Sequence, residues 1–186
     1  MIDLSKNVLP EAVEVCGRFY KVHTSFKYWL AFKKIMDSKP KSYLEFDFLY
    51  DGEKPNDRSE GFKALLGFAN PEEKLPRMDG KDGGKKVLDF DIDSDYIYSA
   101  FLELYGIDLI ESSMHYLKFQ ALLKGLHGTK LNDIIGYRLY ENHSRTYGEY
   151  ERQMEELQRA WELPDEDDED DEKLSAFDEW VEGKGK

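Results

Sequence analysis

Four aspartates alternate along one short stretch of the chain, and carboxylates at this spacing can bind calcium: Asp89, Asp91, Asp93 and Asp95. A calcium-binding loop takes ligands at its first, third and fifth positions, and it also needs a glycine at the sixth position and a carboxylate at the twelfth. Counted from Asp89, those two positions hold Ser94 and Ala100, and a count from Asp91 fails in the same way. The spacing argues against calcium, and we expect one or two of the aspartates to cap a helix that begins near Asp95 and to complement its positive N-terminal end.

Other groupings that could carry out catalysis or bind a cofactor are also incomplete. The glycine-rich segment Gly80–Lys86 lacks the spacing of a phosphate loop and the hydroxyl residue that follows its Gly-Lys pair. No serine stands in a nucleophile-elbow context. The histidines lie singly, without the spacing that zinc requires, at His23, His115, His127 and His143. The sequence therefore favours a non-enzymatic protein that needs no metal and no cofactor.

The net charge of -13 is concentrated near the C-terminus, where Asp165–Glu172 is an unbroken run of eight acids. Such a run repels itself and cannot bury apolar area, so we predict that residues 164–186 form a disordered acidic tail with a short apolar end. An acidic surface also repels nucleic-acid phosphates, which disfavours direct binding to DNA or RNA. An acidic mimic of DNA would need carboxylates spread over a folded body, and their concentration in one tail argues against that function.

The chain has 186 residues, which is enough for one ordinary domain with appendages. Its single cysteine, Cys16, excludes an intramolecular disulfide, and we interpret it as a small hydrophobic residue in a strand. The N-terminus lacks an export signal and no apolar run approaches spanning length, so neither export nor membrane insertion is expected.

The apolar pattern predicts a series of short elements. The stretch Val13–Val22 places β-branched and aromatic residues around a glycine, which is typical of a β-hairpin. Thr24 or Ser25 is suited to cap the amphipathic helix that follows, which stops before Pro40. Apolar residues in Ser42–Tyr50 alternate as in a strand, whereas the family resemblance described below favours a helix, which we adopt. Further helices are predicted at residues 59–70, 95–105, 113–125, 129–140 and 145–162.

Two of these helices carry additional signals. Gly106 follows the helix at residues 95–105 and suits a left-handed C-terminal cap. The apolar residues of the helix at 113–125 occupy more than one face, so we expect it to be the central and most buried helix. Residues 76–86 are predicted to be a flexible surface loop. The expected fold is mainly α: a single helical domain over residues 1–163 with a short N-terminal β-hairpin, followed by the acidic tail.

Four motifs follow one another between Val87 and Arg138: D-x-D-x-D-Y-I-Y-x-A-F, Y-G-I-D-L, H-Y-L-K-F-x-A-L-L-x-G-L and I-I-G-Y-R. The block resembles the signature region of a siphophage tail-assembly family, named after the fifteenth gene product of its type phage. The family occurs in phages and prophages of Gram-positive hosts. The resemblance weakens towards the N-terminus, and the region after about Tyr140 is poorly covered.

The resemblance implies a tail-assembly chaperone. Such a protein keeps the tape measure protein soluble, recruits the major tail protein in the host cytoplasm, and is absent from the mature virion. The second interpretation is a structural tail completion protein that is retained in the virion. The alternative from a different class is a small hydrolase or metal enzyme whose active site the sequence does not reveal. The sequence also leaves open whether the chain forms a homo-oligomer.

The resemblance also places candidate partner-binding residues in the motif block: Tyr105, His115, Tyr116, Phe119, Tyr137 and Arg138. Aromatic and arginine side chains often dominate the binding energy of protein interfaces. The alternative, that most of them are core residues, stays open. The family usually has a histidine followed by two tryptophans where this chain has His115, Tyr116 and Leu117, so any contact made by those rings is altered here.

A second candidate surface lies on the helix predicted at residues 145–162, where apolar residues recur at alternating three- and four-residue intervals: Tyr147, Tyr150, Met154, Leu157 and Trp161. This spacing is that of a coiled-coil seam of about two heptads. Such a seam either binds a partner or packs on its own domain, and the pattern alone does not decide between the two.

Overall fold

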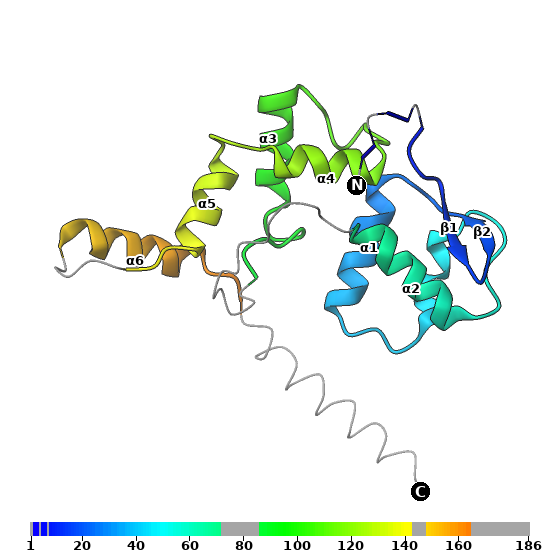
Figure 1. Ribbon diagram of the computed structural model, residues 1–186. Helices are drawn as coiled ribbons and strands as arrows, with labels where there is room; N and C mark the ends of the chain where they lie inside the picture. The colour runs from blue at the N-terminus through cyan, green and yellow to red at the C-terminus, as the bar shows by residue number, and fades with distance from the viewer. Residues whose placement is uncertain (1, 4, 7, 72–85, 143–147, 165–186) are drawn as a thin grey trace, which may run out of the picture. The chain divides into compact units, whose positions relative to one another are not determined.

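The computed structural model describes residues 2–3, 5–6, 8–71, 86–142 and 148–164, and within them the chain is mainly helical with a two-stranded sheet near the N-terminus (Figure 1). The predicted fold class is confirmed. The chain divides into two compact units: a large unit of residues 1–82 and 90–131, and a small unit of residues 83–89 and 132–186. The predicted loop, apart from Lys86, and the predicted tail, apart from Pro164, lie outside the described residues. No helix in the described ranges is long and apolar enough to cross a membrane.

The predicted hairpin is formed by β1 (Ala12–Val15) and β2 (Arg18–Lys21), which pair antiparallel. Cys16 and Gly17 connect the strands with φ angles of 51° and 79°. Two successive positive φ angles are those of a two-residue type I′ turn, whose twist matches that of the flanking strands. Cys16 is exposed, so our interpretation of it as a hydrophobic strand residue is wrong, because it belongs to the turn.

The helices α1 (Phe26–Asp37) and α4 (Tyr116–Lys124) begin side by side in the large unit. Ser25 and His115, the residues just before them, face each other in an antiparallel bridge. The first N–H of α1 donates to a carbonyl of the segment before α4 at 2.9 Å, and the first N–H of α4 donates to the carbonyl of Thr24 at 2.7 Å. The Ser25 side chain makes no capping bond. Backbone pairing therefore replaces the side-chain cap that we expected, and it satisfies an N–H that has no partner within its own helix.

The stretch in which strand and helix patterns competed forms the 3-10 helix η1 (Tyr43–Leu49). Its start is fixed by a capping box, in which the Ser42 hydroxyl and the Glu45 carboxylate each accept a backbone N–H. Residues three apart share a face of a 3-10 helix, and the buried residues of η1, Phe46 and Leu49, have this spacing. The predicted helix is confirmed, as a 3-10 helix and not an α-helix.

Helix α2 (Arg58–Ala69) packs closely on the segment around η1. Arg58 Nε lies 2.8 Å from Asp47 Oδ1, and Arg58 Nη2 donates to Asp47 Oδ2 at 3.1 Å, so a two-point ion pair joins α2 to η1. A Cβ at Gly61 would lie 2.6 Å from Cγ of Pro55. Only glycine allows α2 to approach this closely.

Trp29 stands at the centre of an aromatic core in the large unit. Its side chain is fully buried, and its ring stacks on Phe68 of α2 and Tyr116 of α4 with centroid distances of 4.5 and 5.3 Å. Its indole N–H donates to the carbonyl of His23 at 2.8 Å. One helical turn later, Phe32 extends the ring contacts to η1. One face of α1 therefore holds α2, α4 and η1 together.

Helix α3 (Ser94–Tyr105) ends at Gly106, whose φ of 64° confirms the predicted left-handed cap. Asp93 occupies the position before the helix, but its side chain makes no capping hydrogen bond, and Asp95 lies in the first turn. The Asp93 side chain is therefore not the expected cap, whereas Asp95 is placed to complement the positive end of the helix dipole, as we expected of one or two of the aspartates.

We had expected α4 to be the most buried helix, but it is not. It buries three of its nine residues, Tyr116, Leu117 and Phe119, which is the same share as in α2 with four of twelve, and Lys118 lies exposed between them. The apolar residues spread over several faces, but only one face of α4 is turned towards the core.

The helices α5 (Lys130–Arg138) and α6 (Glu149–Trp161) confirm the last two predicted helices in shorter form. Residues 132–138 of α5 belong to the small unit, as does all of α6. The Glu151 carboxylate accepts the N–H of Gly148 at 2.9 Å, and this bond fixes the start of α6.

Candidate partner-binding site

Tyr116 and Phe119 lie in the core of the large unit. Tyr116 has no exposed surface, its hydroxyl donates to the carbonyl of Ala69 at 3.3 Å, and Gln120 Nε2 donates to it at 2.8 Å. Burial raises the pKa of the Tyr116 hydroxyl to about 12. Phe119 stacks between two further rings at centroid distances of 4.7 and 5.2 Å. Our expectation of a partner contact does not fit side chains in these positions, and we leave both out of the proposed surface.

Tyr105 also supports the fold of the large unit. It is half-buried at the end of α3, and its hydroxyl donates to the carbonyl of Leu122 in α4 at 3.0 Å. A Cβ at Gly125 would lie 2.9 Å from that hydroxyl, so the glycine leaves room for the bond. Tyr105 thereby joins the C-terminal ends of α3 and α4.

His115 caps helix α4, a function that we did not predict. Its Nδ1 accepts the N–H of Leu117 at 3.1 Å, so the ring is neutral and its Nε2 carries the hydrogen. That Nε2–H donates to the carbonyl of Pro10 at 3.0 Å. Burial is the main cause that lowers the pKa of His115 below its ordinary value of 6.5, and Lys118 acts in the same direction, whereas the bond to Pro10 and the charge of Glu11 oppose it. Histidine is not among the preferred capping residues, which explains why its position gave no signal.

Protonation of His115 should destabilise the start of α4, because an imidazolium has no acceptor for the N–H of Leu117. The pKa of the folded form is lowered, so the stabilisation is complete above pH 6.5 and is lost as the pH falls through the folded pKa. We expect the wild-type protein to lose stability between pH 7.5 and about 5.5 by about 1 kcal/mol more than His115→Asn, whose side chain accepts at both pH values. Urea unfolding at the two pH values measures this difference.

The exposed His127 provides the control for this prediction. His127→Asn should follow the wild-type pH dependence, since its ring does not cap a helix start. An equal pH response of His115→Asn and wild type would show that the capping bond does not govern stability in this range.

Tyr137 and Arg138 belong to the small unit. Tyr137 is half-buried, whereas Arg138 has only 4% of its surface exposed. Arg138 Nε donates to the carbonyl of Trp161 at 2.7 Å, and Nη1 donates to the carbonyl of Val87 at 3.0 Å. Gln158 Nε2 donates back to the carbonyls of Arg138 and Tyr140 at 3.4 and 2.8 Å. Arg138 therefore fastens the end of α5 to the end of α6, so we also leave it out of the proposed surface.

The predicted seam on α6 is the candidate site that keeps accessible apolar surface. None of the residues of α6 is buried: Tyr150 is 65% exposed, while Met154, Leu157 and Trp161 are half-buried on the same face. Tyr147, the first member of the seam, lies outside the described residues. The seam from Tyr150 to Trp161 is called the α6 face below.

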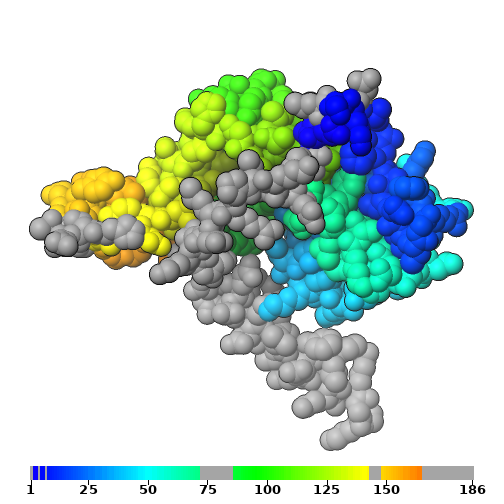
Figure 2. Space-filling view, viewed as in Figure 1, coloured from blue at the N-terminus to red at the C-terminus, as the bar shows by residue number. Residues whose placement is uncertain are grey.

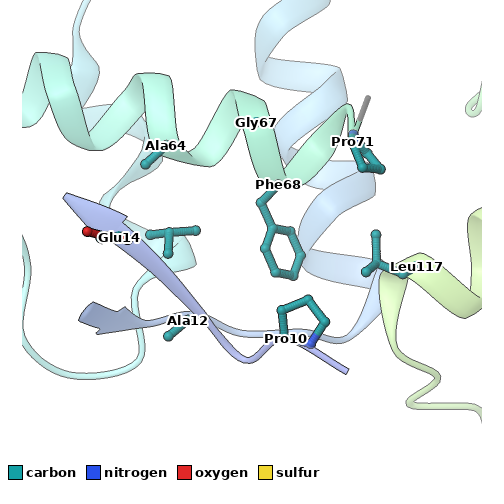
Figure 3. A pocket seen from close by; sticks show the side chains of 9 residues that line it. Pro10, Ala12, Glu14, Ala64, Gly67, Phe68, Pro71 and Leu117 are labelled. Atoms are coloured by element: carbon teal, nitrogen blue, oxygen red, sulfur yellow. The ribbon is translucent and has the colours of Figure 1, made fainter. Parts of the chain in front are cut away.

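A pocket in the large unit was missed by the sequence analysis. It has a volume of about 300 Å³ and is lined by β1, the residues just before it, α2 and the first turn of α4 (Figure 3). The small residues Ala64 and Gly67, three positions apart on α2, were the available signal. We had considered only the large apolar residues of that helix.

Among the described residues, no three histidine, cysteine, aspartate or glutamate side chains lie together as a metal site would require.

The comparisons with known proteins identify the family. A family model described as Bacteriophage Gp15 protein matches residues 5–163, including the region after Tyr140 that we expected to be poorly covered. No curated protein and no solved structure matches the chain. Since the match extends over most of the sequence, the chain belongs to the Bacteriophage Gp15 protein family.

Proposed function

We propose that this phage protein is a tail-assembly chaperone of a siphophage of Gram-positive hosts. It binds the tape measure protein without catalysing a reaction, recruits the major tail protein in the host cytoplasm, and leaves before the virion is complete. The family membership supports a phage function, and the motif block supports the assignment to tail assembly.

The observation that carries the proposal is the α6 face. A helix whose large apolar side chains lie on one side, with none of them buried, offers adaptable contact area to another helix or chain. Tyr150 has the largest exposure on this face, at 65%. Aromatic residues in such positions commonly contribute most to binding.

The proposal is tested by co-expression with the tape measure protein of the same phage. We expect the two proteins to co-purify, and Tyr150→Glu to weaken binding by roughly 30-fold, corresponding to about 2 kcal/mol at an interface hot spot. Gln153→Glu is the matched control, because it adds the same charge to an exposed position of α6. Circular dichroism and thermal melting should be unchanged in both variants.

Two outcomes would contradict the proposal. If the wild-type protein does not bind the tape measure protein, it is not its chaperone. If mass spectrometry finds the chain in purified virions, the structural tail completion protein becomes the better interpretation. Equal binding by Tyr150→Glu and Gln153→Glu would remove the α6 face from the site while leaving the function in place.

A further inference from the structure

The outer edge of β1 offers hydrogen-bonding groups that the described part of the chain does not use. The N–H of Val22 donates to the carbonyl of Glu11 at 2.9 Å, and this bond sets the alternation along the hairpin. Val13 and Val15 therefore bond to β2, whereas the N–H and C=O groups of Ala12 and Glu14 point away from it. No described residue bonds to the backbone of Ala12 or Glu14.

The opposite edge of the hairpin is already paired. Asp51 N–H donates to the carbonyl of Lys21 at 3.0 Å, and His23 N–H donates to the carbonyl of Leu49 at 2.8 Å. The segment that follows η1 thus covers β2. A free strand edge is a template for pairing with another extended chain, and β1 provides that edge.

The pocket found in the large unit lies beside this edge, between β1 and α2. Figure 3 shows Ala64 and Phe68 extending from α2 towards β1, with Pro10 and Leu117 near Phe68. A Cβ at Gly67 would meet no atom within 4 Å, so the wall formed by α2 is open at that point. Figure 2 shows the hairpin in blue and α2 in turquoise next to each other on the surface of the large unit. The pocket is therefore an apolar groove that runs along the outer edge of β1, which no described residue pairs with.

The composition of the groove suits a peptide and not a small polar ligand. Its volume of about 300 Å³ is at the lower end for ligand pockets, and among the described residues that line it Glu14 is the only ionisable one. Peptides that add a strand to a sheet gain affinity from backbone hydrogen bonds and specificity from pockets for alternate side chains. The free edge of β1 supplies the bonds, and the groove supplies the pocket.

The charge of the edge defines the occupant further. Glu14 is exposed, and no described residue forms an ion pair or hydrogen bond with its carboxylate. Pairing of two copies of the chain through β1 with Glu14 opposite Glu14 would place like charges directly across the strands, which is unfavourable. A lysine or arginine opposite Glu14 would be favourable for the same reason.

We propose that the outer edge of β1 and the groove beside it bind an extended segment of a partner protein, with apolar residues opposite Val13 and Val15 and a basic residue opposite Glu14. This site is separate from the α6 face and does not depend on the proposed chaperone function. The segment would complete the hairpin as a third strand.

The test uses the full chain and a synthetic peptide, acetyl-Thr-Val-Lys-Val-Thr-amide, whose lysine matches Glu14 in register. We expect binding in a fluorescence titration, together with slower hydrogen exchange at the amides of Ala12 and Glu14. Gly67→Leu, which fills the groove, should weaken binding by about tenfold or more, equivalent to 1.4 kcal/mol. Gly136→Leu is the control, because Gly136 is also an exposed helical glycine with open space at its Cβ.

A charge exchange makes the test independent of folding defects. A peptide with glutamate in place of the lysine should bind wild type more weakly and Glu14→Lys more tightly, whereas Glu103→Lys on the exposed face of α3 should show no such reversal. The proposal is overturned if the lysine peptide does not bind, or if Gly67→Leu binds it as wild type does. It is also overturned if the Ala12 and Glu14 amides are already protected without peptide, by the chain itself in a monomer or by a second copy in a dimer detected by sedimentation.

Discussion

Replacing Trp29 by alanine should lower the free energy of unfolding of the large unit by about 3–5 kcal/mol, the range typical for deletion of a buried tryptophan. The side chain has no exposed surface and contacts rings from α2 and α4. Its removal leaves a cavity and also deprives the His23 carbonyl of the indole donor. Native domains have stabilities of about 5–15 kcal/mol, so this loss is a large part of the total stability.

Urea unfolding followed by circular dichroism measures this loss. Phe19→Ala is the control, because Phe19 is also a large aromatic residue but is 70% exposed on β2, so the effect should stay within about 0.5 kcal/mol. A loss below about 1 kcal/mol for Trp29→Ala would mean that the aromatic core does not hold α1, α2 and α4 together as described.

The sequence predicted those parts of the fold that depend on local signals. The extents of α1, α2 and α3 follow from helical periodicity, and terminators such as Gly106 mark helix ends. The start of α1 is different, because it is set by backbone pairing with the segment before α4. Even η1, with its conflicting patterns, carries a local capping box at Ser42 and Glu45. Local information was sufficient where a boundary is set by residues within one turn, as at the start of η1 and the end of α3.

The functional positions were harder to predict because they depend on contacts between distant segments. Tyr116 is buried because Trp29 lies against it, and nothing near Tyr116 in the sequence indicates that neighbour. Within the described residues, the outer edge of β1 stays unpaired because the segment after η1 pairs with β2 instead. Motif spacing identified a block of related residues, but it could not separate those that build the core from those that reach the surface.

The same distinction decides the effect of changing Arg138, which we expected from sequence to be either a partner contact or a core residue. Arg138→Ala should destabilise the small unit by about 3 kcal/mol, because hydrogen bonds to a charged group contribute about 1.5–3 kcal/mol each. The carbonyls of Val87 and Trp161 would lose their donor. Hydrogen exchange of the α6 amides should then accelerate by roughly 100-fold, since each 1.4 kcal/mol is a factor of ten. Binding measured through the α6 face would fall as a consequence of this unfolding.

Two further arginine variants separate structure from binding. Arg152→Ala removes an exposed arginine of α6 whose partner is Glu149, and surface ion pairs contribute little, so exchange should change by less than about threefold. Arg138→Lys keeps the positive charge but loses the rigid fork that reaches two carbonyls at once, so its effect should lie between wild type and Arg138→Ala. If Arg138→Ala lost partner binding while the α6 amides exchanged as slowly as in wild type, Arg138 would be a contact residue after all, and its two carbonyl bonds would not be what holds α6 in place.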